Sequence, residues 1–352
     1  MSKRIKINND NIGEGCPPYI IAEMSANHNG NIDTAFNIIK SAKLAGADAI
    51  KIQTYQPDTI TLKSSLPDFQ INSGLWEGRT LYELYDWAHT PWEWHKDLFE
   101  CAQKNGITIF SSPFDNTAVD LLEDLNTPAY KIASFEATDL PLIEYAASTG
   151  KPIIISTGMA NLDEIAEAID AAKGVGCKEL ALLHCVSGYP APAEDYNLKT
   201  IPDLIERFGL VTGLSDHTLD NITAISSVAL GASIVEKHFT LDRNGGGPDD
   251  SFSLEPVDLK SLCEWAKIAW NSLGKIDYSR KSSEIENIKF RRSLYYIKDM
   301  KEGEIITTDS VQSVRPGYGI SPKYMTTIIG KKLTRSVNKN TPVKFDHFGI
   351  FE

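Results

Sequence analysis

The stretch VTGLSDHTLDNITAISSVALGASIVEKHF, residues 211–239, decides the fold. It has a short apolar run at each end, and between them lies segment 221–232, whose apolar spacing is typical of an amphipathic helix. His217 closes the first run, and His238 lies at the end of the second. The stretch predicts a strand, a helix and a second, parallel strand. If both strands belong to one sheet, their carboxyl ends place the two imidazoles at the same edge.

The same unit recurs through the first three-quarters of the chain. Short runs rich in Ile, Val and Ala alternate with helical patterns, several of which end at a glycine suited to a helix C-cap. The runs are YIIAEMSA (19–26), AIKIQTY (49–55), ITIFSSP (107–113), AYKIAS (129–134), PIIISTG (152–158), LALLHCVSG (180–188), VTGLSDH (211–217) and SIVEKHF (233–239). This alternation predicts an α/β protein with a (β/α)8 TIM barrel. A doubly wound open sheet is the alternative, but its nucleotide-binding version has a glycine-rich turn where this chain reads NHNGN.

The pattern changes after about residue 282, where short β-like pieces are separated by Gly, Pro and Asn. These pieces are SLYYIKDM (293–300), GEIITTDSVQSVRPG (303–317) and LTRSVNKNTPVKF (333–345). We therefore expect a barrel domain over 1–280, a linker over 281–290 and a small β-rich domain over 291–352. Residues 56–95 form a long insertion between the second and third strands. The tryptophans of its segment LYELYDWAHTPWEWH favour an ordered insertion over a disordered one.

Composition excludes several classes of protein. The 352 residues are 42% hydrophobic and 23% charged, which is typical of a globular protein with a large core. A net charge of -12 without a basic stripe argues against nucleic acid as a partner. The five cysteines are odd in number and lack a C-x-x-C pair, which indicates reduced thiols in the cytoplasm. No stretch approaches the roughly 20 apolar residues of a membrane helix, so we expect no membrane association.

Polar residues close most of the eight runs, and in barrel enzymes the carboxyl ends of the strands carry the chemistry. Lys51 and Lys131 lie inside apolar runs, where a buried ammonium needs a carboxylate or an anionic ligand. Several serines close neighbouring runs: Ser112, Ser134, Ser156 and Ser215. Together these residues favour an anion site suited to phosphate. Internal ion pairs, such as Lys51 with Glu23, are one alternative, and a Schiff-base lysine is another.

The pair His217 and His238 indicates a divalent-metal site, because neutral imidazoles bind such ions at about 2.0–2.1 Å. No third protein ligand is evident. This favours a weakly held hard cation, Mn2+ or Mg2+, over a structural Zn2+, and leaves positions open for water and substrate. The loop GGGPDD, 245–250, ends in carboxylates that could bind sugar hydroxyls or amides, although it can also be a plain turn.

Several segments together resemble the sialic acid (nonulosonic acid) synthases: IAEMSANHNG, AIKIQTY, AYKIAS, PIIISTGM, GLSDHTLDN, EKHFTLDRNGGGPD and SVRPGYGISP. The resemblance extends over essentially the whole chain. It implies a metal-dependent barrel that condenses phosphoenolpyruvate (PEP) with an N-acylated sugar and releases phosphate by C–O cleavage, followed by an antifreeze-like (SAF) domain. The opening AEMSANHNG and the segment TPWEWH are most similar to the branch that makes pseudaminic acid, whose acceptor is 2,4-diacetamido-2,4,6-trideoxy-L-altrose.

The resemblance also implies roles for individual residues. His217 and His238 hold the metal, with Mn2+ expected and Mg2+ or Co2+ as alternatives. Glu23 and Glu136 lie near the reacting centre, where one stabilises positive charge or handles the proton of the attacking water. The positions that bind PEP are Lys51, Ser112, Lys131, Ser134, Ser156, Ser187 and Ser215. The positions that contact the sugar are Gln53, Tyr189, Asp249 and Arg315.

Two positions of the resemblance have wider consequences. Arg315, in VRPG, matches an arginine that enters the barrel of a partner subunit, which implies a domain-swapped homodimer. Where acetylneuraminate synthases typically read HCTNxYP, this chain reads HCVSGYP, so Ser187 replaces an amide donor. This departure weighs against N-acetylmannosamine as the acceptor. N-acetylneuraminate or legionaminate synthesis, a Schiff-base aldolase at Lys51 or Lys131, and a carbohydrate-binding protein without activity stay open as alternatives.

Overall fold

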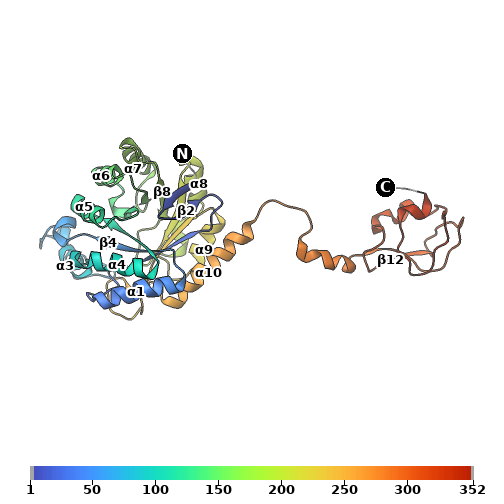
Figure 1. Cartoon of the computed structure of the whole chain (residues 1–352), viewed down its shortest axis with the longest axis horizontal. Coiled ribbons are helices and arrows are strands. Elements are labelled where there is room, and N and C mark those ends of the chain that lie inside the picture. Colours follow the sequence, from blue (N-terminus) through green and yellow to red (C-terminus); the bar gives the residue numbers. More distant parts are fainter. Residues whose placement is uncertain (1–3, 350–352) are drawn as a thin grey trace. The chain divides into compact units, whose positions relative to one another are not determined.

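The computed structural model describes residues 4–349, so the outermost residues of the two predicted domains, 1–3 and 350–352, lie outside it. The boundary between its two compact units lies between Gly274 and Lys275. The first unit is the predicted TIM barrel (Figure 1). Its parallel strands form a closed ring in which β10 pairs with β3. The strands are β3 (Tyr19–Glu23), β4 (Ala49–Thr54), β5 (Thr108–Pro113), β6 (Tyr130–Ile132), β7 (Ile153–Ser156), β8 (Leu180–Cys185), β9 (Val211–Asp216) and β10 (Ile234–His238). All eight lie within the predicted runs, because strands covered by helices outside and packed inside read as continuous apolar stretches.

A helix follows each strand, and together these helices surround the barrel (Figure 1). These helices are α1 (Ile32–Ala45), α4 (His95–Asn105), α5 (Asn116–Asp124), α6 (Leu140–Ser148), α7 (Leu162–Gly174), α8 (Thr200–Phe208), α9 (Ile222–Ala229) and α10 (Pro256–Leu273). Helix α1 shows how local sequence sets the boundaries of a helix. The Asn31 side chain accepts hydrogen bonds from backbone amides of the first turn, and Gly46 ends the helix with a φ of 98°. In the part of the chain that the structure describes, no helix is both long and apolar enough to cross a bilayer.

The amino-terminal hairpin, β1 (Arg4–Ile7) and β2 (Asp10–Gly13), was not predicted. Its Ile5, Ile7 and Ile12 are buried in a cluster with residues near the starts of the barrel strands. The hairpin therefore closes the barrel at the amino ends of the strands. The opposite ends stay free for polar side chains.

The insertion between β4 and α4 contains helices α2 (Pro57–Ile60) and α3 (Leu81–Ala88) and 3-10 turns that include Trp92–Trp94. Hydrogen bonds join its end to the barrel: Trp92 Nε1 donates to the Tyr55 carbonyl at 3.2 Å, and His95 Nε2 lies 2.8 Å from Thr54 Oγ1. The insertion is thus fixed against the carboxyl end of β4.

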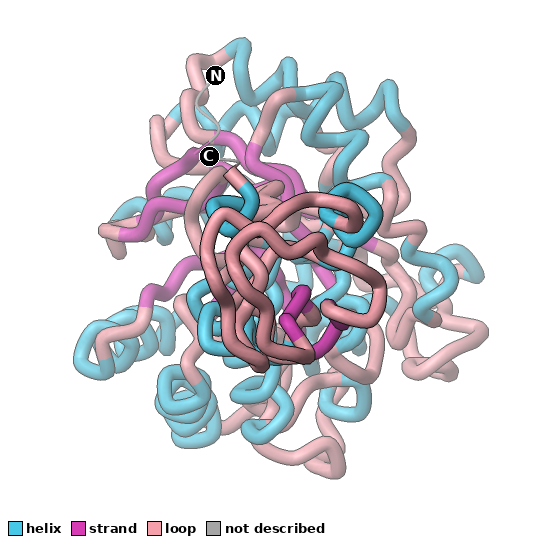
Figure 2. Tube along the Cα trace, turned by 90° about the vertical axis from the view of Figure 1, so that its right-hand side faces the viewer, coloured by secondary structure: helices cyan, strands magenta, loops and turns pink. Residues whose placement is uncertain are grey.

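The second unit has its own hydrophobic core, which includes Leu294, Tyr296 and Val343. It contains a 3-10 helix, Ser282–Phe290, the antiparallel strands β11 (Ser293–Tyr296) and β12 (Val311–Val314), and the short helix α11 (Met325–Ile328). Most of it is loop (Figure 2). The segment 333–345, predicted as β-like, pairs only through isolated bridges such as Met300 with Val337.

Candidate functional site

A cavity of about 310 Å³ opens at the carboxyl ends of the barrel strands, lined by thirteen of the fifteen predicted site residues. These are Glu23, Lys51, Gln53, Lys131, Ser134, Glu136, Ser156, Ser187, Tyr189, Ser215, His217, His238 and Asp249. Ser112 is fully buried outside this lining and accepts a hydrogen bond from Lys51 Nζ at 3.1 Å. Arg315 belongs to the second unit. The structure therefore brings the predicted barrel residues into one place, while their roles stay predictions.

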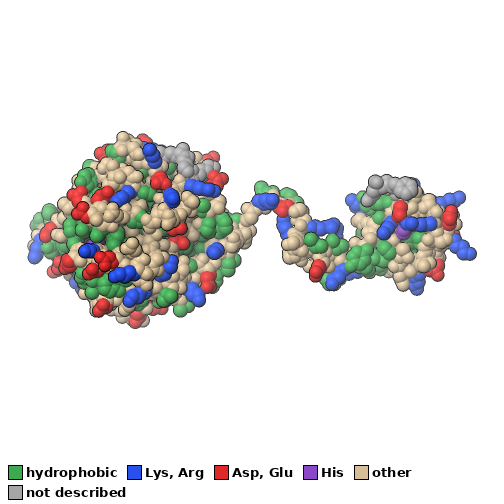
Figure 3. All heavy atoms as spheres, in the orientation of Figure 1, with side chains coloured by type: hydrophobic (Ala, Val, Ile, Leu, Met, Phe, Trp, Pro, Cys, Tyr) green, Lys and Arg blue, Asp and Glu red, His purple; other side chains and the backbone are tan. Residues whose placement is uncertain are grey.

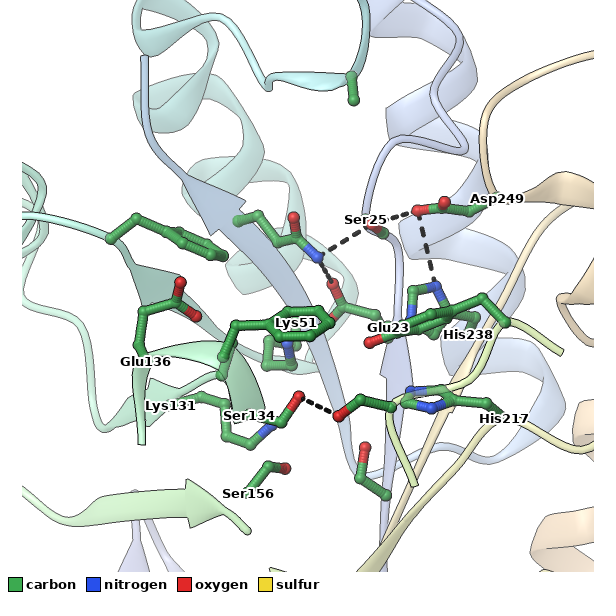
Figure 4. Close-up of a pocket in the computed structure, with 18 of the residues that line it drawn as sticks. Glu23, Ser25, Lys51, Lys131, Ser134, Glu136, Ser156, His217, His238 and Asp249 are labelled. Atoms are coloured by element: carbon green, nitrogen blue, oxygen red, sulfur yellow. Dashed lines mark hydrogen bonds and ion pairs between the residues drawn. The ribbon is translucent and has the colours of Figure 1, made fainter. Parts of the chain in front are cut away.

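Two lysines and two glutamates form a buried cluster in this cavity: Lys51, Lys131, Glu23 and Glu236. Figure 4 labels the first three of them. Lys51 Nζ lies 2.6 Å from Glu23 Oε2 and 3.8 Å from Glu236 Oε1, and Lys131 Nζ lies 3.0 Å from the same Glu236 oxygen. Burial opposes ionisation of Glu236, but Lys131 and Lys51 outweigh it and lower its pKa. Burial raises the pKa of Glu23 more than Lys51 lowers it. The cluster thus has no surplus of negative charge that would repel an anion.

Five buried polar atoms of the cavity have no hydrogen-bond partner in the described structure: Glu23 Oε2, Glu136 Oε2, Ser156 Oγ, Glu236 Oε2 and His238 Nδ1. Of these, Glu23 Oε2 has an ion pair with Lys51 Nζ at 2.6 Å. Buried polar atoms are nearly always bonded, because each unpaired one costs about 1–3 kcal/mol. Their concentration in one cavity indicates that a polar ligand completes it.

The two histidines lie together at one side of the cavity, with ring centroids 5.5 Å apart (Figure 4). Burial lowers the pKa of His217 to about 4 and holds that of His238 well below its usual range, so both imidazoles are neutral. His217 Nδ1 lies 2.8 Å from the Val186 carbonyl, which fixes the proton on Nδ1 and leaves a lone pair on Nε2. Among the described residues, no group of three or more His, Cys, Asp or Glu is arranged to hold a metal. Two neutral imidazoles are ligands of the type that divalent ions take, and the metal site stays a prediction.

A chain of hydrogen bonds joins Asp249 to Glu23 along the cavity (Figure 4). Asp249 Oδ2 lies 2.5 Å from Ser25 Oγ, and Gln53 Nε2 lies 3.0 Å from Ser25 Oγ and 3.1 Å from Glu23 Oε1. Asp249 Oδ2 is also 3.8 Å from His238 Nδ1. The loop after β10 is thereby held to the ends of β3 and β4.

The insertion after β4 supplies much of the apolar lining: Ile60, Trp76, Leu84, Tyr85 and Ala88. Tyr55 packs edge-on against Tyr85 and Phe114, at centroid distances of 5.7 and 5.1 Å. Trp76 Nε1 donates to the Pro248 carbonyl at 2.9 Å, which ties the insertion to the loop after β10. The cavity therefore combines ionisable groups with an apolar wall, as expected for an amphipathic ligand.

Glu136 follows β6 and lies across the cavity from His217 and His238 (Figure 4). Burial raises its pKa to about 7. A carboxyl group with this pKa can both accept and give up a proton near neutral pH, as a general acid or base must.

Sequence reasoning assigned no role to Glu236 or Ser25. A signal for Glu236 was present, because it lies inside an apolar run two residues before His238 and therefore on the same face of the strand. Lys237, on the opposite face, pairs with Asp216 at 2.8 Å. Ser25 had only its position after the first strand as a signal.

Residues 38–278 match the model of the NeuB family, and residues 291–349 match the SAF domain. The chain belongs to the NeuB family. Two relatives come from Campylobacter jejuni serotype O:2. A pseudaminic acid synthase is 44% identical over 332 residues, covering 94% of this chain and 96% of that protein. An N,N'-diacetyllegionaminic acid synthase is 38% identical over 329 residues, covering 92% and 98%.

A solved structure extends this assignment to the NeuB-family fold. The N-acetylneuraminic acid synthetase of Leptospira borgpetersenii, crystallised with citrate, is similar with a TM-score of 0.73 at 33% identity, covering 83% of this chain and 97% of that chain. The comparisons confirm the resemblance to sialic acid synthases and the predicted order of a TIM barrel and a SAF domain.

Proposed function

We propose that this NeuB-family enzyme condenses PEP with 2,4-diacetamido-2,4,6-trideoxy-L-altrose to give pseudaminic acid and phosphate. The observation that carries the proposal is a single cavity in which buried lysines, a neutral histidine pair and an apolar wall meet. The higher identity to the pseudaminic acid synthase than to the legionaminic acid synthase of the same bacterium supports the branch.

The lysine cluster suits PEP. Lys51 and Lys131 supply positive charge, and Ser156 Oγ, which lacks a partner in the described structure, can donate to a phosphate oxygen. Ser134 and Ser187, whose hydroxyls are 2.8 Å apart, line the same cavity and offer further donors. These groups hold the phosphate and carboxylate of PEP so that its methylene carbon faces the second substrate.

The apolar wall suits a 6-deoxy sugar. A methyl group at C6 packs against side chains such as Ile60 and Leu84, whereas the C6 hydroxyl of N-acetylmannosamine would lose its water there without gaining a protein partner. His217 and His238 would hold the divalent ion, Mn2+ by preference, and the ion would supply the Lewis acidity that polarises the sugar aldehyde.

In the reaction, the PEP methylene carbon forms a bond to the aldehyde carbon, water adds to the former C2 of PEP, and the tetrahedral species loses phosphate by C–O cleavage. Glu136, with a pKa of about 7, takes the proton from the attacking water. Glu23, 2.6 Å from Lys51, would stabilise the positive charge that develops on the former PEP carbon.

A domain-swapped homodimer completes the proposal, with Arg315 of each chain entering the barrel of its partner. Large hydrophobic side chains are exposed on α10 of the barrel unit: Trp265 is 51% and Ile268 63% exposed. Green hydrophobic patches are visible on the surface of the barrel unit (Figure 3). Such surface on a single chain favours a protein partner.

The test is phosphate release and product mass with PEP, Mn2+ and one of three acceptors: the trideoxy-altrose, the legionaminic acid precursor or N-acetylmannosamine. We expect turnover of the trideoxy-altrose alone, abolished by EDTA. Turnover of only one of the other two acceptors overturns the assignment to the pseudaminic acid branch. Activity that survives EDTA and is trapped by borohydride overturns the synthase in favour of a Schiff-base aldolase.

A further inference from the structure

Ser25 has an unusual backbone conformation for its residue type. Its φ is 45°, in the left-handed region, and every other described non-glycine residue with a positive φ is an asparagine. The Cβ of serine disfavours this region, which glycine adopts freely and asparagine tolerates. Ser25 is also buried, with 4% of its surface exposed. A strained, buried serine where glycine fits better indicates that its hydroxyl is needed.

The bonds of that hydroxyl have a fixed direction. The carboxylate of Asp249 can only accept, so Ser25 Oγ donates its single proton to Asp249 Oδ2, 2.5 Å away. Ser25 Oγ in turn accepts from Gln53 Nε2 at 3.0 Å. The same Gln53 nitrogen donates to Glu23 Oε1 at 3.1 Å, so both of its hydrogens are used. The Gln53 carbonyl oxygen is the group that this side chain has left for a ligand.

We infer that Ser25 is a positioning residue that sets the hydrogen-bond polarity of the sugar subsite. It holds Gln53 and Asp249 so that both present oxygen acceptors, and the acceptor sugar must supply donors there, either hydroxyl or amide N–H groups. This inference rests on the proposed function, in which Gln53 and Asp249 contact the sugar. It adds a rule for substrate choice: an N-acyl group that keeps its N–H is accepted, and an N-alkylated one is rejected.

The Ser25 hydroxyl bonds to Asp249 and Gln53, whereas the two lysines of the cluster pair with Glu23 and Glu236. Loss of Ser25 should therefore affect the sugar rather than PEP. The test compares Ser25→Ala, which loses the hydroxyl and keeps the backbone strain, with Ser25→Gly, which loses both. Both variants should raise the KM for the trideoxy sugar about tenfold, the loss expected for one or two hydrogen bonds, and leave the KM for PEP within about twofold. Ser25→Gly should have the higher melting temperature, because glycine relieves the strain.

Two controls separate the causes. Ser272→Ala removes an exposed hydroxyl of α10 and should leave both KM values unchanged. A sugar analogue with methylated amide nitrogens should bind the wild type about tenfold more weakly than the parent sugar does. In Ser25→Ala the difference in affinity between analogue and parent sugar should be much smaller, as a double-mutant cycle would show for two coupled groups. Sugar binding is measured by calorimetry as well as by turnover.

The outcomes distinguish the inference from the function on which it rests. If Ser25→Gly keeps the wild-type KM for the sugar, or if its KM for PEP rises equally, Ser25 does not set the hydrogen-bond polarity of the sugar subsite. The inference is then overturned, and the proposed synthase activity is unaffected. If the wild type neither binds nor converts the sugar, both the inference about Ser25 and the proposed function are overturned. A selective loss of sugar affinity in both variants supports the inference.

Discussion

At the scale of single residues, Glu236 sets the charge balance of the two buried lysines. Glu236→Gln removes the partner of Lys131, 3.0 Å away, and should lower the free energy of unfolding by about 3–5 kcal/mol, because a buried charge loses its counterion. PEP supplies negative charge to the same cluster. It should therefore raise the melting temperature of the variant more than that of the wild type.

Calorimetry with and without PEP measures both effects. The matched control is Glu264→Gln on α10, where an exposed pair with Lys260 spans 3.9 Å, and this change should cost less than about 1 kcal/mol. An equal or smaller PEP shift in Glu236→Gln would show that PEP does not bind at the lysines.

Glu136 makes both activity and stability depend on pH. Burial raises its pKa from 4.5 to about 7, so the folded chain binds this proton more tightly than the unfolded chain. Folded stability should fall as pH rises from about 4.5 to about 7, by roughly 1–3 kcal/mol after allowing for partial exposure. Glu136→Gln should remove this fall and also the limb of the kcat/KM profile near pH 7.

Thermal unfolding of both proteins at pH 5 and pH 8 tests the stability effect, and a pH–rate profile tests the catalytic one. The same pH dependence in Glu136→Gln and the wild type would show that another group titrates.

Residues that end strands could be predicted, because the carboxyl ends of parallel strands share one edge of the barrel whatever the details of packing. That rule found Lys131, His217 and His238. It could not assign Ser25, whose role depends on a contact with Asp249, 224 residues away in the chain. The rule also included Ser112, which the structure buries outside the cavity lining.

At the scale of elements, one buried lysine on β10 fixes the segment that follows β9. Lys237 Nζ donates to Asp216 Oδ2 and to the carbonyls of Thr218 and Asp220, each at 2.8 Å. His217 lies within this segment. Lys237→Met should cost about 3–5 kcal/mol, since it leaves a buried carboxylate unpaired, and should weaken Mn2+ binding about tenfold, as loss of support behind a metal ligand does.

Urea unfolding and Mn2+ titration by electron paramagnetic resonance measure the two effects separately. Adding Asp216→Asn to Lys237→Met should recover part of the stability, because no unpaired charge then remains. Lys260→Met, exposed on α10, is the control. Unchanged Mn2+ affinity in a destabilised Lys237→Met would confine Lys237 to a structural role.

Element boundaries were predictable where each element carries its own period and caps, as in α1 and the barrel strands. The hairpin β1–β2 is different. Each strand has only four residues, too few for alternation to stand out, and its burial depends on the barrel that it closes. The segment 333–345 was predicted to be β-like but contains no regular strand. Its β-branched residues pack into a core formed mostly by loops.

At the scale of the whole molecule, the proposed homodimer makes a prediction that one chain alone cannot satisfy. If Arg315 acts in the barrel of its partner, Arg315→Ala and Glu136→Gln damage different parts of one shared site. Each variant alone should have little activity. After mixing and reassociation, about half of the dimers contain one chain of each kind, and one of their two sites is intact, so activity should recover to about a quarter of the wild type.

Phosphate release before and after mixing measures the recovery, and size-exclusion chromatography confirms the dimer. Arg335→Ala is the matched control, because its exposed pair with Asp346 is worth less than about 1 kcal/mol and its loss should leave activity unchanged. No recovery in dimers that demonstrably exchange chains would place Arg315 in the barrel of its own chain or outside the site altogether. Recovery requires a site built from two chains, because neither variant chain contains a complete set of residues.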